Sequence, residues 1–206
     1  MTGDAMAITL FHAPNTRSST VLALLEELGA PFALRLLDLQ AGEGRSPEFL
    51  AVNPLGKVPT LLDGDTPVTE QVAICLHLAD RFPQAGLAPA PDDPLRGRYL
   101  RWLVFYAASF EPAVIDRATQ RDPAPQRMSP YGTYDAVMDA VAGMLTPGPY
   151  VLGERYSAAD VVWGSALAWT LRFGIVPALP IFQDYAGRIT ARPAFQRARA
   201  RDAAAG

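Results

Sequence analysis

The alternation of apolar and polar residues predicts a strand, a helix and a second strand at the start of the chain. Residues 7–12 and 32–39 alternate in the way that half-buried strands do. Residues 21–28 carry apolar side chains at helical spacing, and Gly29 supplies a natural helix end. Strands joined through a helix run parallel, so we expect these two strands to be parallel members of one sheet.

A second group of elements completes the first part of the chain. Residues 46–53 predict a short helix capped by Ser46, and residues 60–68 predict two strands around an Asp-Gly-Asp turn. A tight hairpin is antiparallel, so the sheet is expected to be mixed. Residues 71–82 predict a closing helix, whose apolar face carries Val72, Cys75, Leu76 and Ala79. The first 83 residues are thus predicted to form an α/β domain covered by helices.

The rest of the chain has a different pattern. Residues 84–94 are rich in proline and have no periodicity, which is typical of a linker. Residues 95–206 have helical spacing almost throughout and predict an all-α domain. Its expected helices cover residues 95–119, 134–145 and 158–173, with shorter ones near Ile181 and Ala194.

Composition and charge exclude several classes of function. The net charge is −3 over 206 residues, and no basic run with interleaved aromatic residues occurs, so a nucleic-acid partner is not expected. A single cysteine, Cys75, excludes an internal disulfide, and two distant histidines do not suggest a zinc site. No apolar run approaches the roughly 20 residues that span a bilayer. We therefore expect a cytoplasmic protein without a metal or a membrane partner.

The segment NPLGKVPTL, residues 53–61, places a proline at the entry to a predicted strand. Pro59 has no N–H for a sheet ladder, so the simple interpretation is an extended strand entry. Alternatively, a cis proline here turns the backbone of Val58 outward, where its N–H and C=O can pair with an extended peptide. The segment therefore also suggests a site for a peptide backbone.

Two helix starts offer further polar groups. Glu70 and Gln71 begin the helix over residues 71–82, either as part of a cap on Thr69 or as a site for a ligand carboxylate and ammonium. Asn15, Thr16 and Ser18 precede the first helix. Each is a good N-cap, and the same N-terminus would stabilise an incoming thiolate.

In this order, these segments resemble the cytosolic glutathione transferase superfamily, most of all its bacterial members, over nearly the whole chain. The resemblance is carried by NTRSSTVLALLEELG, SPEFLAVNPLGKVPTL, TEQVAICLHLAD, YSAADVVWGSAL and ARPAFQRA. It implies a thioredoxin-like N-terminal domain followed by an all-α domain. It also implies a homodimer that binds glutathione as co-substrate and performs the detoxification chemistry of this family.

The resemblance also assigns residues to glutathione. Val58, before a cis Pro59, takes the role of backbone partner to the cysteinyl unit, and Lys57 falls near the glycyl carboxylate. Glu70 and Gln71 fall on the acid-serine pair that holds the γ-glutamyl group. Gln71 departs from the usual serine, although its amide still donates to a carboxylate.

The catalytic position follows from the same resemblance. Family members activate the thiol with tyrosine, serine or cysteine near the first helix, and no tyrosine or cysteine stands there. Counting back from Gly29, Thr16 takes the serine position, with Asn15 and Ser18 as alternatives. Arg17 takes the cysteine position.

Three further features complete the expectations. The pocket for the second substrate is assigned to aromatic side chains that are also plausible core residues, namely Trp102, Tyr106, Trp169 and Phe173. Cys75 is expected to be a small buried apolar residue, which disfavours a cysteine-dependent reductase. SAAD, residues 157–160, is expected to be a structural capping box.

Three functions remain open at this stage. The first is attack of activated glutathione on an apolar electrophile. The second is glutathione-dependent reduction of peroxides or disulfides. The third is a non-catalytic relative that binds a protein or a hydrophobic ligand.

Overall fold

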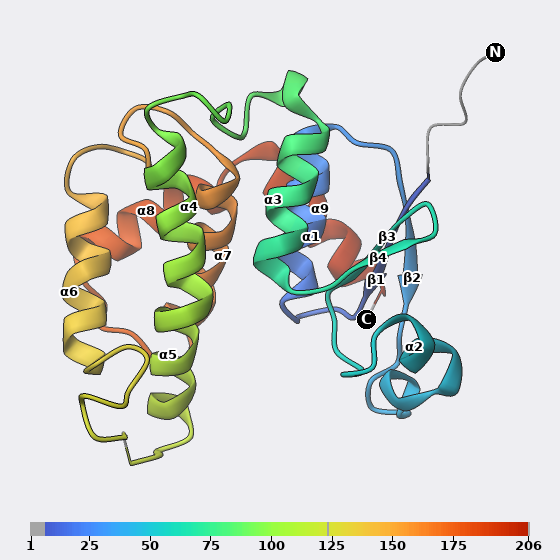
Figure 1. The fold of residues 1–206 in the computed structure, drawn as a ribbon, viewed down its shortest axis with the longest axis horizontal. Coiled ribbons are helices and arrows are strands. Elements are labelled where there is room, and N and C mark those ends of the chain that lie inside the picture. The colour runs from blue at the N-terminus through green and yellow to red at the C-terminus, as the bar shows by residue number, and fades with distance from the viewer. Residues whose placement is uncertain (1–6, 123, 206) are drawn as a thin grey trace. The chain divides into compact units, whose positions relative to one another are not determined.

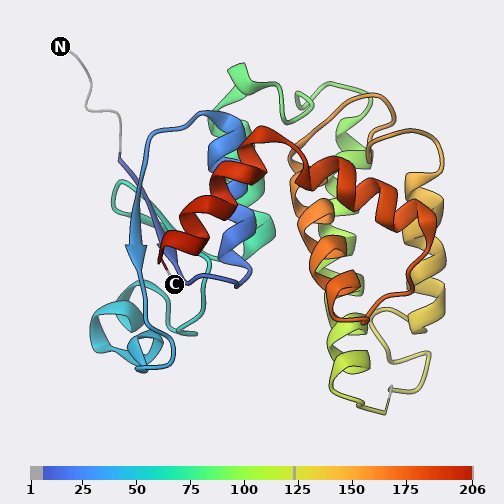
Figure 2. The ribbon, with the colours of Figure 1, turned by 180° about the vertical axis from the view of Figure 1, so that it is seen from behind.

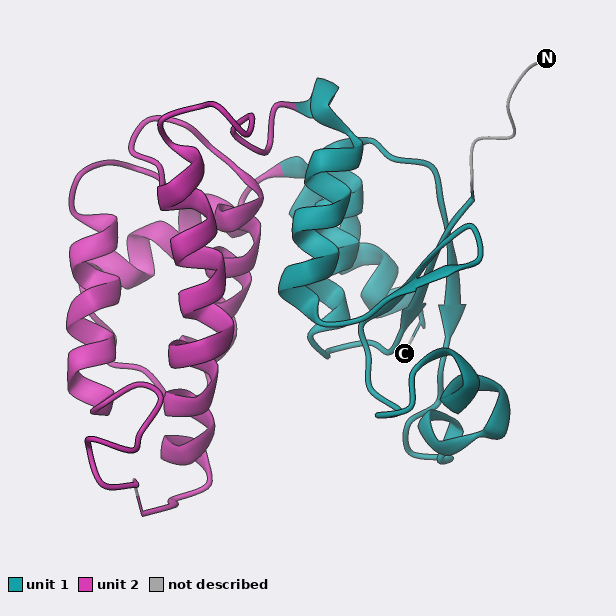
Figure 3. Ribbon diagram, in the orientation of Figure 1, with its two compact units in different colours: residues 1–85, 193–206 teal, residues 86–192 magenta. Residues whose placement is uncertain are grey.

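The computed structural model describes residues 7–122 and 124–205, which fall into two compact units (Figures 1 and 3). Unit 1 comprises the described residues up to Ala85 together with Pro193–Ala205. Unit 2 comprises the described residues of Gly86–Arg192. No helix in the described part of the chain is long and apolar enough to cross a membrane.

Unit 1 has the mixed sheet that the hydrophobic pattern predicts. Its strand order is β2-β1-β3-β4, with β1 parallel to β2 and antiparallel to β3, and with β3 antiparallel to β4. The strands are β1 (Ile8–His12), β2 (Phe32–Leu36), β3 (Thr60–Asp63) and β4 (Thr66–Val68). The helices are α1 (Ser18–Leu28), α2 (Pro47–Val52), α3 (Gln71–Arg81) and α9 (Pro193–Ala205), with 3₁₀ turns at Glu43–Arg45 and Pro83–Ala85.

The alternation along β1 divides its side chains between the two faces of the sheet. Ile8, Leu10 and His12 are buried on one face, the face that α1 covers. Phe11 points to the other face and packs against Phe49 of α2, with ring centroids 5.2 Å apart. His12 therefore places a polar ring on the buried face of the sheet, beside apolar side chains.

β2 is shorter than predicted because Asp38 starts a turn. Its carboxylate accepts hydrogen bonds from the backbone N–H groups of Gln40 and Ala41, at 2.9 Å each. Such a local turn competes with continuation of the strand. The other predicted short elements are confirmed, including the Ser46 cap, which accepts from the N–H of Phe49.

The last helix belongs to unit 1, which differs from the predicted all-helical domain over residues 95–206. α9 lies beside α1, as Figure 2 shows from behind. Glu26 of α1 accepts from Arg197 and Arg201 of α9, each at 2.7 Å. These charged pairs, together with contacts made by Asp202 of α9, attach the end of the chain to the α/β unit.

Unit 2 is all helical, as predicted. It consists of α4 (Arg96–Phe105), a π-helical segment (Tyr106–Phe110), α5 (Glu111–Ala118), α6 (Tyr134–Leu145), α7 (Ala158–Arg172) and α8 (Pro180–Thr190). Trp163 of α7 is fully buried at its centre, and its indole N–H donates to the Trp102 carbonyl at 3.1 Å. The long helix predicted over residues 95–119 is thus a run of three segments.

The SAAD segment forms the predicted capping box at the start of α7. The Asp160 carboxylate accepts from the Ser157 N–H at 2.8 Å and lies 3.0 Å from the Ser157 hydroxyl. It also accepts from the Val151 N–H and the Tyr185 hydroxyl, both at 2.8 Å. This buried carboxylate therefore connects α7, α8 and the preceding loop.

Candidate functional site

The register of the sheet brings the three segments with predicted site residues to one end of unit 1. Phe11 pairs with Thr60, so the end of β1 lies beside the start of β3. Leu61 pairs with Val68, so the end of β4 lies there too. The loop before α1, the loop before β3 and the start of α3 therefore all meet at this end of the sheet.

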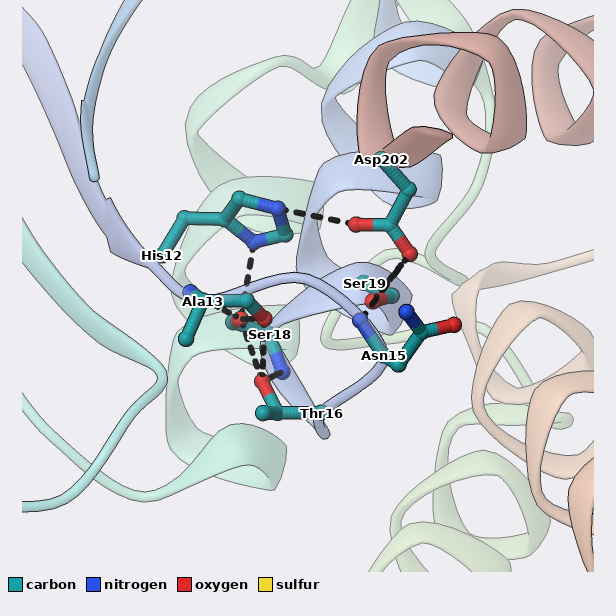
Figure 4. Close-up of polar contacts among 7 residues, drawn as sticks. All are labelled: His12, Ala13, Asn15, Thr16, Ser18, Ser19 and Asp202. Carbon is teal, nitrogen blue, oxygen red and sulfur yellow. Dashed lines mark hydrogen bonds and ion pairs between the residues drawn. The ribbon is translucent and has the colours of Figure 1, made fainter. Parts of the chain in front are cut away.

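The loop before α1 is closed by two hydroxyl groups (Figure 4). The Thr16 hydroxyl oxygen lies 2.7 Å from both the Ala13 carbonyl and the Ser18 hydroxyl, and it accepts from the Ser18 N–H at 3.2 Å. The Ser18 hydroxyl accepts from the Ala13 N–H at 3.2 Å. Thr16 is half-buried and Ser18 is fully buried, so of these two residues only Thr16 is partly open to solvent.

Asn15 has a different environment from the two hydroxyl residues. Its side chain is exposed and its backbone has a φ of +58°, a left-handed conformation that asparagine tolerates better than most residues. Its backbone N–H lies 3.4 Å from a carboxylate oxygen of Asp202. Thr16 thus combines a fixed hydroxyl with partial exposure, whereas Asn15 has only the exposure.

The Ser18 hydroxyl continues into a buried polar chain. It lies 2.8 Å from Nδ1 of His12, and Nε2 of His12 lies 2.8 Å from Oδ1 of Asp202. The other oxygen of Asp202 accepts from the Ser19 hydroxyl at 2.7 Å. Figure 4 shows these side chains following one another from Thr16 to α9.

The charge state of Asp202 follows from its contacts. Partial burial raises the pKa of this carboxyl, but hydrogen bonds from His12, Ser19 and the Asn15 N–H outweigh that effect and lower the pKa below its ordinary value. Asp202 is therefore an anion at neutral pH.

The loop before β3 is held from inside by Asn53. The Asn53 amide donates to the Lys57 carbonyl and to the Thr60 hydroxyl, both at 2.9 Å, and its oxygen accepts from the Leu55 N–H. The Val58–Pro59 peptide bond is cis, which confirms the prediction. In the described part of the chain no hydrogen bond engages the Val58 backbone, and Lys57 is exposed.

The start of α3 is built differently from the predicted threonine cap. Glu70, not Thr69, is the N-cap residue, and its side chain makes no capping hydrogen bond. Its φ of +65° places a non-glycine residue in the left-handed region, which costs on the order of 1–3 kcal/mol. The Glu70 side chain is exposed, whereas Gln71 is buried.

The structure divides the aromatic residues assigned to the second substrate into two pairs. Trp102 and Tyr106 are buried in the core of unit 2, where Tyr106 packs edge-on against Trp163 at 5.7 Å. Trp169 and Phe173 are 50% and 57% exposed and lie 4.9 Å apart. The first pair has the environment of ordinary core residues, and the second forms an exposed aromatic surface.

Cys75 and His77 have reactive side chains, but burial or contacts with neighbouring side chains account for both. Cys75 is fully buried, and burial raises the pKa of its thiol to about 12, so it is not a thiolate at neutral pH. His77 lies 2.8 Å from Asp63, which also pairs with Arg81 at 3.1 Å. The described residues contain no group of three or more potential metal ligands of the histidine, cysteine and carboxylate kinds.

Sequence reasoning missed His12, Asn53 and Asp202. Asn53 stands in the quoted segment NPLGKVPTL. Asparagine before a loop often hydrogen-bonds the backbone of that loop, and this was the signal that could have identified it. His12 ends a strand on its apolar face, which is a detectable anomaly. Asp202 gave no signal, since it lies 183 positions beyond Ser19.

Comparisons with known proteins agree with this architecture. The profile of the family "Glutathione S-transferase, N-terminal domain" matches residues 6–80. A crystal structure of a glutathione transferase from Methylococcus capsulatus is 31% identical, with a TM-score of 0.82 over 96% of this chain and 100% of that chain.

Two further relatives cover almost the same length. A sphingomonad glutathione S-transferase, solved in complex with glutathione, is 33% identical, with a TM-score of 0.77 over 95% of this chain and 98% of its own. The disulfide-bond oxidoreductase YfcG of Escherichia coli is 29% identical over 91% of this chain and 92% of its own. On its sequence and its fold, therefore, this chain belongs to the cytosolic glutathione transferase superfamily.

Proposed function

We propose that unit 1 binds glutathione at the end of the sheet where its three functional segments meet, and that the chain transfers the glutathione thiol to an apolar electrophile. The observation that carries this proposal is the half-buried Thr16 hydroxyl, fixed at the N-terminus of α1 beside the Val58 loop and the start of α3. Glutathione complexes of relatives with this fold support it.

Each part of glutathione has a chemical partner in this proposal. The N–H and C=O of Val58 pair with the cysteinyl backbone as an added strand does. The exposed Glu70 carboxylate takes the γ-glutamyl ammonium, and Gln71 at the positive end of α3 takes the adjacent carboxylate. Lys57 supplies a cation for the glycyl carboxylate.

The reaction then proceeds at Thr16. Its hydroxyl and the N–H groups of the helix start stabilise negative charge on sulfur, because they are fixed dipoles in a partly dry site. The thiolate attacks an electrophilic carbon, a C–S bond forms, and the leaving group departs with its bonding electrons. The exposed pair Trp169 and Phe173 is our choice for contact with the apolar substrate, whereas Trp102 and Tyr106 are buried in the core of unit 2. We propose that the active form is a homodimer.

The carboxylate of Glu70 is tested by replacement with glutamine. Glu70→Gln keeps the size but removes the charge, so affinity for glutathione, measured by calorimetry, is expected to fall by about 10-fold to 100-fold. Asp65→Asn is the matched control, because this exposed acid lies in the hairpin turn at the opposite end of β3. An equal loss in both variants would mean that net charge alone, and not the Glu70 site, governs binding.

A second candidate reaction is favoured by one relative. The similarity to a disulfide-bond oxidoreductase over 91% of this chain supports glutathione-dependent disulfide reduction. In that reaction the thiolate attacks one sulfur of a disulfide, a mixed disulfide forms and the other sulfur leaves as a thiolate. A second glutathione then releases the substrate thiol and forms oxidised glutathione.

The two reactions are separated by parallel assays. Purified protein is given reduced glutathione with an aryl halide, with an organic peroxide and with a small organic disulfide. We expect kcat/KM to be highest for the aryl halide. Preference for the disulfide would replace transfer by reduction, and absence of glutathione binding by calorimetry would remove both reactions and leave a non-catalytic role.

A further inference from the structure

With Asp202 ionised and the His12 ring neutral, the contacts of the buried chain from Thr16 to Asp202 allow a consistent arrangement of protons. A carboxylate only accepts, so the proton between Asp202 and His12 must sit on Nε2 of His12. In the neutral ring, Nδ1 then has a lone pair and must accept from the Ser18 hydroxyl at 2.8 Å. The tautomer of His12 is thus fixed by Asp202.

The same reasoning fixes the two hydroxyl groups. Ser18 has one hydroxyl proton and two acceptors within reach, Nδ1 of His12 at 2.8 Å and the Ala13 carbonyl at 3.1 Å. When the shorter contact, to His12, takes the proton, the Ser18 oxygen can accept from the Ala13 N–H and from the Thr16 hydroxyl. The Thr16 proton therefore points inward, to Ser18 or to the Ala13 carbonyl, both 2.7 Å away. With its proton directed inward and one lone pair accepting from the Ser18 N–H, the oxygen of the half-buried Thr16 keeps one lone pair that can accept from a thiol.

We propose that the thiol proton of bound glutathione passes through the hydroxyl groups of Thr16 and Ser18 to Nδ1 of His12, and that Asp202 stabilises the imidazolium. This inference rests on the proposed function, since it takes the thiol to lie at Thr16. The S–H proton moves to Thr16 as the Thr16 proton moves to Ser18 and the Ser18 proton moves to His12. One S–H bond is broken, one N–H bond is formed, and the electron pair remains on sulfur.

The proton relay also returns Thr16 to the role of donor. After the transfer, the proton that came from the thiol sits on Thr16 and faces the new thiolate. Once the leaving group has departed, the His12 proton returns through the same hydroxyls to water at the Thr16 end. His12 and Asp202 act on the thiol only through Thr16, so they are positioning residues and not residues that touch the substrate.

His12 is the final proton acceptor of the relay because it is buried and faces the Asp202 carboxylate. His12 is fully buried and Asp202 is 14% exposed in its side chain, so the imidazolium and carboxylate face each other largely out of water. Several charged groups on the packed elements are engaged elsewhere: Glu26 with Arg197 and Arg201, Asp63 with His77 and Arg81, and Arg35 over the Phe11 ring. Asp202 is therefore the counter-charge that faces the ring.

The test counts protons while glutathione binds. Thiolate formation is followed by its ultraviolet absorbance, and proton release is measured by calorimetry in two buffers of different ionisation enthalpy at one pH near neutrality. For the wild-type protein we expect thiolate absorbance with almost no proton released, because His12 keeps the proton. Stabilisation of the thiolate by hydroxyl and N–H groups alone would instead release one proton for each thiolate formed.

Variants extend the test to the buried end of the relay. His12→Asn leaves Asp202 as an unpaired anion, so the double variant with Asp202→Asn is made to preserve folding. In the double variant, amide side chains at positions 12 and 202 can still hydrogen-bond Ser18 and Ser19, but no side chain there can accept the thiol proton. We expect its thiolate fraction near neutral pH to fall about tenfold, with any remaining thiolate accompanied by proton release. Ser19→Ala removes a hydroxyl that contacts Asp202 but carries no relayed proton. Asp202 keeps its contacts with His12 and the Asn15 N–H, so this variant is expected to keep a thiolate fraction well above that of the double variant, without proton release.

The possible failures are distinguishable. Wild-type protein that binds glutathione and forms the thiolate with full proton release overturns the relay and leaves the proposed function intact. Binding without any thiolate absorbance also overturns the relay. Absence of glutathione binding overturns the proposed function, and the relay with it.

Discussion

Replacement of Thr16 with valine is expected to lower kcat for transfer to an aryl halide by about 10²-fold, the usual effect of removing one hydrogen-bond donor from developing charge. Valine has the shape of threonine but cannot donate to sulfur or accept from the thiol. The Thr16 hydroxyl also accepts from the Ser18 N–H, so the variant loses a local helix contact as well. The KM for glutathione should change little, because binding rests on Val58, Glu70 and Gln71.

The matched control for this prediction is Thr16→Ser, which keeps the hydroxyl and drops only the methyl group. Steady-state kinetics and circular dichroism are measured on both variants. We expect the serine variant to retain most of the activity and both variants to retain their helical signal. A valine variant as active as wild type would move thiol activation to another group, with Asn15 as the first to examine.

Replacement of Asp160 with alanine is expected to lower the free energy of unfolding by about 3–5 kcal/mol, because each buried donor left without an acceptor costs about 1–3 kcal/mol. The change leaves the Val151 N–H, the Ser157 N–H and the Tyr185 hydroxyl without their acceptor in a fully buried place. Chemical denaturation followed by tryptophan fluorescence measures the loss. Asp184→Ala, at an exposed position of α8, is the control and should change stability by less than about 0.5 kcal/mol.

The same residue predicts a pH dependence. Burial raises the pKa of Asp160 from 3.8 to about 6, against the hydrogen bonds that lower it. A raised pKa in the folded state means that the folded protein holds the proton more tightly than the unfolded chain does. The stability that this gives is complete below pH 3.8 and is lost as the pH rises through about 6. The gap between wild type and Asp160→Ala should therefore be wider at pH 4 than at pH 7, and a gap that widens toward pH 7 would contradict the assigned direction.

Local patterns were sufficient for most of the secondary structure. α6 begins at Tyr134 and ends at Leu145, as the spacing predicts, and the hairpin around Gly64 has the predicted antiparallel pairing. These elements follow from periodicity, turn residues and caps, all of which act over a few positions. Departures occur where a side chain or packing overrides the pattern, as at the Asp38 turn and in the π-helical segment at Tyr106–Phe110.

Those residues of the candidate site that stand in short, characteristic sequence segments were predictable. Pro59, Glu70 and Thr16 stand in short segments whose residue types suggest backbone pairing, charge recognition and hydroxyl chemistry. The left-handed backbone of Glu70 and the inward direction of the Thr16 hydroxyl were not predictable, because both depend on contacts with other segments.

The sequence by itself determined the order of strands and helices and the family, and it predicted the segments of the candidate site. Only the tertiary structure decided that α9 belongs to unit 1 and that Asp202 reaches back to His12. The physical reason is that a hydrogen bond between residues far apart in the chain depends on how the helices pack, and no periodicity within either segment encodes it.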